Sequence, residues 1–213
     1  MPATNKRFIT ADDLYKFQVI SNVRISPNGK SIVFAVQRVD RKTEKKYSNL
    51  WMVNTALGSK PRQYTFGDQS DSHPEWSPDG KQIAFISNRG NKEKPAQIYM
   101  IETTGGEARP LTQIEGEINN FNWTPDGKQL VCEIRKTDPE ILAREKDPDL
   151  KKLSTPSRHY ERVFYKLDGY GYLPRERTHL WSVNVFTGKS TQLTDHKVFD
   201  ESEADVSPDG KWI

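Results

Sequence analysis

The sequence predicts an all-β fold, a partial β-propeller of four-stranded antiparallel blades, because three elements recur along the chain in a fixed order. A turn of nearly constant sequence comes first, an apolar run follows it, and a second run rich in aromatic residues comes next. The serine or threonine of the turn lies at positions 26, 77, 124 and 207, at intervals of 51, 47 and 83 residues. A period of roughly 40 to 50 residues is typical of propeller blades, and the longest interval corresponds to one repeat with an insertion.

The residue types of the turn explain why it reverses the chain. Proline presets φ at the first corner of the turn, and Asp or Asn tolerates the backbone conformation of the second corner. Glycine then adopts the positive φ that reverses the direction of the chain. Each copy therefore predicts a hairpin. The four copies are ISPNGK at 25–30, WSPDGK at 76–81, WTPDGK at 123–128 and VSPDGK at 206–211.

Three runs after each turn have strand character. The first is short and apolar, as expected of a strand buried between neighbouring sheets, the second is apolar and aromatic, and the third is a polar, edge-like run ending in threonine. With the partly apolar stretch before the turn, they give four strands per repeat, which is the blade of a propeller. The first, apolar runs occupy residues 31–36, 82–87 and 129–134. The second, aromatic runs occupy 49–54, 97–102 and 179–184. The third, polar runs occupy 62–65, 109–112 and 191–194.

These elements divide the chain into a lead-in and four blades, of which the last is only begun. The lead-in, residues 1–18, contains a short helix, because Thr10 is a suitable N-cap and two acids, Asp12 and Asp13, follow it in the first turn. The fourth blade is expected to contribute one strand. The blades cover residues 19–67, 68–113 and 114–195, and the start of the fourth covers 196–213.

The third blade carries an insertion at 137–172. Asp138 and Pro139 with mixed charges beyond them predict a helix there. The insertion ends in an aromatic run at 163–172 that contains two glycines. This run has two interpretations, a binding loop at the rim of the propeller or a segment packed back onto its body.

Composition excludes several functional classes. The chain has 213 residues, 34% of them hydrophobic, and its 32 basic and 29 acidic side chains are interspersed, whereas a nucleic-acid surface concentrates Lys and Arg on one face. The sequence contains no long apolar run, so we expect no signal peptide, no membrane association and a cytoplasmic location. The single cysteine, Cys132, falls in an apolar run and is expected to be a small core residue.

The sequence assigns no catalytic, cofactor-binding or metal-binding residue. The four histidines lack the spacing of metal ligands, and neither a metal nor another cofactor is predicted. A helix start explains Asp12 and Asp13, and an exposed connection explains Glu201 and Glu203. The run Gly188-Lys-Ser-Thr-Gln192 lacks the second glycine of a nucleophile elbow. The histidines are His73, His159, His179 and His196.

Four stretches together carry a resemblance to a known family. They are FITADDL at 8–14, the repeated SPDGK turn, ISNR at 86–89 and YKLDG at 165–169. The chain resembles, over essentially its whole length, the N-terminal propeller of acylaminoacyl-peptidases and dipeptidyl aminopeptidases of the prolyl oligopeptidase family. That family carries Ser, Asp and His in a C-terminal α/β-hydrolase domain, and its Gly-x-Ser-x-Gly motif is missing from these 213 residues. The catalytic domain is therefore expected to be absent from this chain.

The resemblance implies a steric role for the propeller. It would admit short peptides to the active site and exclude folded proteins, so its expected partners are the hydrolase domain and peptide substrates. In that arrangement Leu14, Tyr15 and Phe17 of the N-terminal helix would pack against the hydrolase domain. The alternative is a stand-alone TolB-like propeller that acts as a protein-interaction module, because the repeated turn also occurs in propellers of that type.

Overall fold

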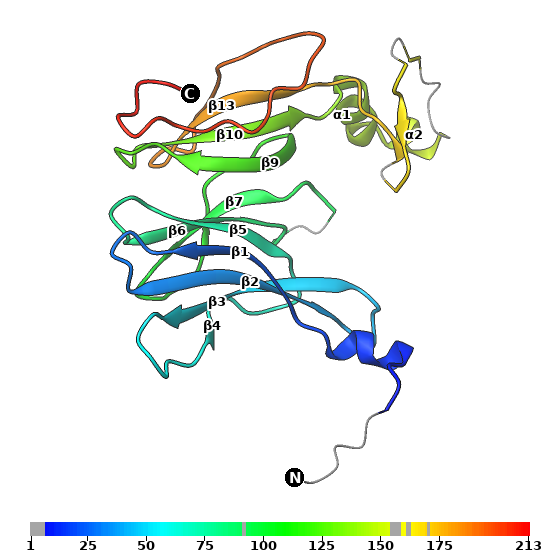
Figure 1. Ribbon diagram of the computed structural model, residues 1–213. Coiled ribbons are helices and arrows are strands. Elements are labelled where there is room, and N and C mark those ends of the chain that lie inside the picture. The colour runs from blue at the N-terminus through cyan, green and yellow to red at the C-terminus, as the bar shows by residue number, and fades with distance from the viewer. Residues whose placement is uncertain (1–6, 91–92, 154–158, 161–162, 170) are drawn as a thin grey trace. The chain divides into compact units, whose positions relative to one another are not determined.

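The computed structural model describes residues 7–90, 93–153, 159–160, 163–169 and 171–213 (Figure 1). By its internal contacts the chain divides into two compact units, Met1–Leu111 and Thr112–Ile213. Within the described ranges each of three sheets has four antiparallel strands, which confirms the predicted blades.

The first unit holds two of these sheets, and in both the strands follow one another in sequence order. The two central strands of each sheet coincide with the predicted apolar runs or extend them, whereas the fourth strand is shorter than predicted. The first sheet consists of β1 (Val19–Ile25), β2 (Ser31–Val39), β3 (Lys46–Asn54) and β4 (Arg62–Gln63). The second sheet consists of β5 (Asp71–Trp76), β6 (Gln82–Ser87), β7 (Gln97–Glu102) and β8 (Arg109–Pro110).

The second unit holds the third sheet, in the order β14-β13-β10-β9, and the insertion between β10 and β13. The insertion contains two short helices, as predicted, and also a two-stranded hairpin (Figure 1). The sheet strands are β9 (Gly116–Trp123), β10 (Gln129–Lys136), β13 (Thr178–Asn184) and β14 (Ser190–Gln192). The insertion elements are α1 (Pro139–Lys146), α2 (Pro148–Lys152), β11 (Lys166–Leu167) and β12 (Gly171–Tyr172).

The predicted N-terminal helix is a single stretch of 3₁₀-helix, η1 (Ala11–Lys16). Its start is fixed by Asp13, whose carboxylate accepts from the Thr10 N–H at 2.9 Å and pairs with Arg7 and Lys16. Leu14 and Phe17 are about half exposed, so their predicted contact with another domain stays a prediction.

The core of the first unit lies between its two sheets. Residues of β2 and β3 meet residues of β6 and β7, and Trp76 and Tyr99 pack against this cluster. Burial of this kind contributes roughly 25 cal/mol per Å² of apolar surface and is the main force that holds neighbouring blades together. The buried members are Val33, Ala35, Leu50, Met52, Tyr64, Ile83, Phe85 and Ile101.

The four recurring turns form the same hydrogen-bond pattern. In the second turn the Ser77 hydroxyl donates to Asp79 at 2.7 Å, and the Asp79 carboxylate accepts from the Lys81 N–H at 3.0 Å. Gly80 closes the turn with φ of 69°, which a glycine adopts without strain. The same bonds join Ser26 with Asn28, Thr124 with Asp126 and Ser207 with Asp209.

Acid is expected to loosen three of these turns and to spare the first. The hydroxyl of the turn, followed by the backbone N–H of the turn lysine, lowers the pKa of the aspartate in each case. A carboxyl whose pKa is lowered by folding stabilises the turn at pH values above 3.8, the ordinary pKa of aspartate. This stabilisation is lost as the pH falls through the lowered pKa of the folded state. Asn28 occupies the same place in the first turn and does not titrate.

Amide hydrogen exchange and chemical shifts, followed by NMR from about pH 5 to 2, would check this expectation because they report each turn separately. The reporting amides are those of Lys81, Lys128 and Lys211, with Lys30 as the internal control. Equal loss of protection at all four lysines would contradict it, since the first turn has no carboxylate.

The predicted first strand of a fourth blade is not formed in the described chain, which has no strand beyond Gln192. A strand needs a paired neighbour, and across the fourth turn only Ser207 pairs its N–H with the Trp212 carbonyl. Residues 201–204 instead bond to the third sheet. Several apolar residues of β1, among them Ile20 and Ile25, are exposed.

Candidate functional site

One histidine lies within a sheet strand at an irregular position. His73 lies inside β5, at a bulge between Ser72 and Glu75. Its φ of 49° recurs at Asn22 and at Glu203, each four residues before a turn serine, so the bulge belongs to the repeat. Burial, with Arg24 second, lowers the pKa of His73.

The other histidines also take structural places. His159 is exposed, and Nδ1 of His196 accepts from the Val198 and Phe199 N–H groups. His179 contacts Glu201, with 2.8 Å between Nδ1 and Oε2, and this bond lowers the pKa of Glu201. In the described ranges no three His, Cys, Asp or Glu side chains are grouped to hold a metal ion.

The remaining candidates have structural roles too. Cys132 is fully buried in β10, and burial raises the pKa of its thiol, so it is the core residue that the sequence predicted. Glu203 is exposed, as expected, and its backbone N–H donates to Oε1 of Glu133 at 2.7 Å. Together with the Asn122 amide, which donates to the Ala204 carbonyl at 2.7 Å, this bond ties the segment after β14 onto the third sheet.

The aromatic run of the insertion packs largely on itself. The rings of Tyr160, Tyr165 and Tyr172 lie 5.2 to 6.4 Å apart, while Val163 and Phe164 stay exposed. Residues 161–162 and 170 of this region lie outside the described residues.

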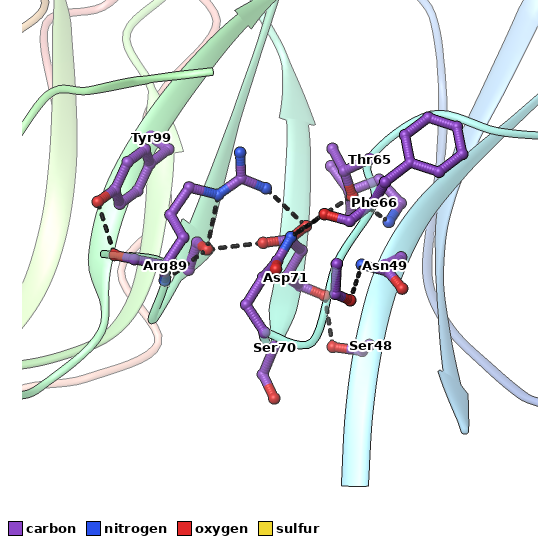
Figure 2. A network of polar contacts seen from close by, with 12 residues as sticks. Ser48, Asn49, Thr65, Phe66, Ser70, Asp71, Arg89 and Tyr99 are labelled. Carbon is purple, nitrogen blue, oxygen red and sulfur yellow. Dashed lines mark hydrogen bonds and ion pairs between the residues drawn. The ribbon is translucent and has the colours of Figure 1, made fainter. Parts of the chain in front are cut away.

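The most developed polar network of the first unit surrounds Asp71, which is completely buried (Figure 2). Its carboxylate accepts from the hydroxyls of Thr65 and Ser87, both at 2.6 Å, and from the Arg89 guanidinium at 2.8 Å. Thr65 also accepts from the Leu50 N–H at 2.8 Å. Because Thr65 follows the first sheet and Ser87 belongs to the second, Asp71 joins two neighbouring blades.

Arg89 is held in place by more than its charge. Its guanidinium carbon lies 5.0 Å from the ring centre of Phe85 and 5.4 Å from that of Tyr99, and the Tyr99 hydroxyl donates to its carbonyl at 2.9 Å. The carboxylate of Asp71 is thus buried and held by three close protein donors, which suits a structural joint between blades.

The sequence reasoning missed this joint, although a signal was available. Asp71 and Glu201 both stand six residues before a turn serine, and threonines end the preceding repeats at 65 and 194. The structure gives Glu201 a corresponding bond to Thr194. The two pairs of a threonine and an acid lie far apart in the sequence, so the correspondence between them becomes visible only when the repeats are aligned.

The second unit contains a cavity of about 230 Å³ on one face of the third sheet. Its floor is the nearly buried indole of Trp181, and the Lys136 ammonium lies 4.5 Å from the ring centre. Arg177 pairs with Asp200 at 3.4 Å, and burial raises the pKa of Glu176 at the rim. The lining is completed by Ile134, His179 and Gln192.

Comparison with known proteins identifies both the fold and its relatives. The model of the TolB β-propeller domain, PD40, matches residues 14–162. The chain is 33% identical over 213 residues to the uncharacterized peptidase YuxL of Bacillus subtilis (strain 168), covering 98% of this chain and 31% of YuxL. It is 29% identical to dipeptidyl-peptidase 5 of Porphyromonas endodontalis, covering 96% of this chain and 30% of that protein. The chain thus spans about a third of the length of these relatives.

Solved structures agree on the fold. An acylaminoacyl peptidase of Pyrococcus horikoshii superposes with a TM-score of 0.62 at 20% identity, over 84% of this chain and 25% of that one. TolB of Acinetobacter baumannii superposes with a TM-score of 0.55 at 19% identity, over 89% of this chain and 35% of that one. At this identity the likeness shows the propeller fold and nothing of activity.

Proposed function

The chain belongs to the TolB β-propeller family, and from this premise we propose that it is the non-catalytic propeller portion of a serine peptidase of the prolyl oligopeptidase type. Its role is to gate the access of short peptides to a hydrolase domain that these 213 residues do not contain.

The observation that carries this proposal is the relationship to YuxL. One third of a protein named as a peptidase aligns with nearly the whole of this chain at 33% identity. Two of the described side chains that could have suggested other chemistry have structural places, because Asp71 joins two blades and Cys132 is buried in the core, and Gly-x-Ser-x-Gly is absent from the sequence.

A gate of this kind works by size. A propeller of rigid blades leaves a passage that an extended peptide enters and a folded protein does not, so selectivity arises without any bond to the scissile group. The buried Asp71 joint keeps two blades together and in this way preserves the width of the passage.

The experiment is to read the coding DNA beyond Ile213, express the encoded protein and measure hydrolysis of acylated and dipeptide reporters. We expect further blades, a Gly-x-Ser-x-Gly motif and rates that fall steeply as the same cleavage site is placed in longer or folded substrates. An added catalytic domain that cleaves folded and short substrates alike would refute the gate. Blades that run to a stop codon without a nucleophile would refute the peptidase assignment.

A stand-alone interaction module of TolB type is the second candidate. It is favoured by the family match, which covers residues 14–162 and describes a domain shared with TolB. The same reading of the coding DNA separates the two candidates, since a module of this type adds no hydrolase domain.

The proposal includes peptide substrates as partners, a cytoplasmic location and no association with nucleic acid or membranes. Over the described residues no helix is both long and apolar enough to cross a membrane. Fractionation of the native cells with an antibody against this chain would test the location directly.

A further inference from the structure

The cavity of the third sheet occupies the place that the Asp71 joint occupies in the second sheet. In the second sheet Ser87 pairs with Asp71 on β5 and with Gln97 on β7. In the third sheet Ile134 pairs in the same way with Ile118 on β9 and with His179 on β13. The two sheets therefore correspond strand by strand at this position.

A cation lies over an aromatic ring at both places. Arg89, two residues after Ser87, lies 5.4 Å from the ring centre of Tyr99. Lys136, two residues after Ile134, lies 4.5 Å from the ring centre of Trp181. The rings themselves correspond, because Tyr99 pairs with Phe85 and Trp181 pairs with Cys132 at the equivalent step of the central strands.

The third sheet has no carboxylate at the position that corresponds to Asp71. Asp71 completes the first site by accepting from Arg89, whereas its counterpart is the buried side chain of Ile118. The side chain of Lys136 consequently makes no ion pair or hydrogen bond with any described residue of the second unit beyond its contact with the Trp181 ring. Lys136 therefore lines the cavity without a carboxylate partner of the kind that Arg89 has in Asp71.

The indole of Trp181 adds a second, independent observation. Trp181 is 7% exposed and lines the cavity, yet its Nε1–H is buried without an acceptor in the described structure. At the corresponding ring the Tyr99 hydroxyl donates to the Arg89 carbonyl. Buried donors are nearly always satisfied, so this unpaired N–H marks a place in the described structure where an acceptor is missing.

We propose that this cavity binds the carboxylate of a peptide, which takes the position that Asp71 fills in the neighbouring blade. The carboxylate pairs with Lys136 beside the Trp181 indole, while the stem of the ligand packs against Ile134 and the indole. The identification of the ligand as a peptide rests on the proposed function. The preference for a carboxylate rests only on the comparison of the second and third sheets at the Asp71 position.

The neighbouring charges leave Lys136 as the available cation. Arg177 is paired with Asp200, and Nδ1 of His179 contacts Glu201. Among the described residues that line the cavity Glu176 is the one acid, and burial raises the pKa of its carboxyl. A cation held close to an aromatic face favours a charge-assisted bond over a contact with neutral ligands.

Three small ligands of nearly equal shape separate the possible sources of the carboxylate. N-acetylglutamine carries only a terminal carboxylate, N-acetylglutamic α-amide carries only a side-chain carboxylate, and N-acetylglutamine amide carries none. Each is titrated into the 213-residue chain while the indole N–H signal of Trp181, assigned with Trp181→Phe, is followed by NMR. We expect one or both carboxylates to shift this signal with a dissociation constant on the order of 1 mM, and the amide to leave it unchanged.

Two variants and a control test the residues. Lys136→Met is expected to weaken binding by about tenfold or more, because it removes the charge and keeps much of the volume. Ile118→Asp supplies an internal carboxylate and is expected to abolish binding by occupying the site. Lys128→Met removes a lysine of the third turn, paired with Asp126 at 3.9 Å, and is expected to bind like the parent chain.

Each outcome decides the inference. Equal shifts with the neutral amide, equal shifts with chloride, or unchanged binding in Lys136→Met would overturn it. If Ile118→Asp does not fold, Lys136→Met still decides, since it alters an exposed side chain. The peptidase assignment stands or falls separately on the sequence beyond Ile213, so binding without a hydrolase domain would uphold the site and reject the function.

Discussion

Replacing Asp71 with alanine is expected to lower the free energy of unfolding of the chain by about 3 kcal/mol, the lower end of the roughly 3–5 kcal/mol that a broken buried pair costs. The change leaves the hydroxyls of Thr65 and Ser87 without their acceptor. It also leaves the guanidinium of Arg89, whose side chain is only 20% exposed, without its counter-ion. Urea unfolding followed by tryptophan fluorescence measures the loss.

Asp68→Ala is the matched control for this prediction. Asp68 pairs with Arg38 at the same 2.8 Å, but its side chain is 64% exposed. Exposed pairs contribute about 0–1 kcal/mol, so the control should stay close to the parent chain. Asp71→Asn should fall between the two, because an amide oxygen still accepts while the charge is lost. Equal losses at positions 68 and 71 would show that burial of Asp71 does not matter.

Phe85→Ala is expected to lower the free energy of unfolding by about 3–5 kcal/mol, the range for truncating a buried phenylalanine. Phe85 is fully buried in the cluster between the first two sheets, and its ring lies 6.2 Å from that of Tyr99. Removing the ring loses its burial and leaves a void that rigid strands on both sides fill poorly. The same unfolding experiment measures it.

Phe66→Ala serves as the control, because Phe66 is 70% exposed. The substitution removes the same atoms, but from the surface. Its expected change is within about 0.5 kcal/mol. A double variant of Asp71 and Phe85 should cost less than the sum of the two, since both hold Arg89. Strict additivity would show that the two contacts act independently.

The sequence anticipated much of the local structure because each prediction depended on neighbouring residues. Gly80 and its counterparts require positive φ in the turns, so the turns were predictable one by one. The central strands β6 and β7 have the predicted bounds, since their apolar runs end in turn residues. The insertion was predicted as helical, and its hairpin was missed because strands of two residues leave no periodic pattern.

The sequence by itself determined the repeat, the turns, the central strands of the blades and the lack of a Gly-x-Ser-x-Gly motif in these 213 residues, because these depend on residues close together in the chain. Only the tertiary structure decided which side chains meet across strands. It brought Asp71 to Thr65 of one blade and Ser87 of the next, and it set Ile118 opposite Ile134 below an unpaired Lys136. Strand register fixes such pairs, and register is settled by packing across the whole sheet and not by any local run of residues.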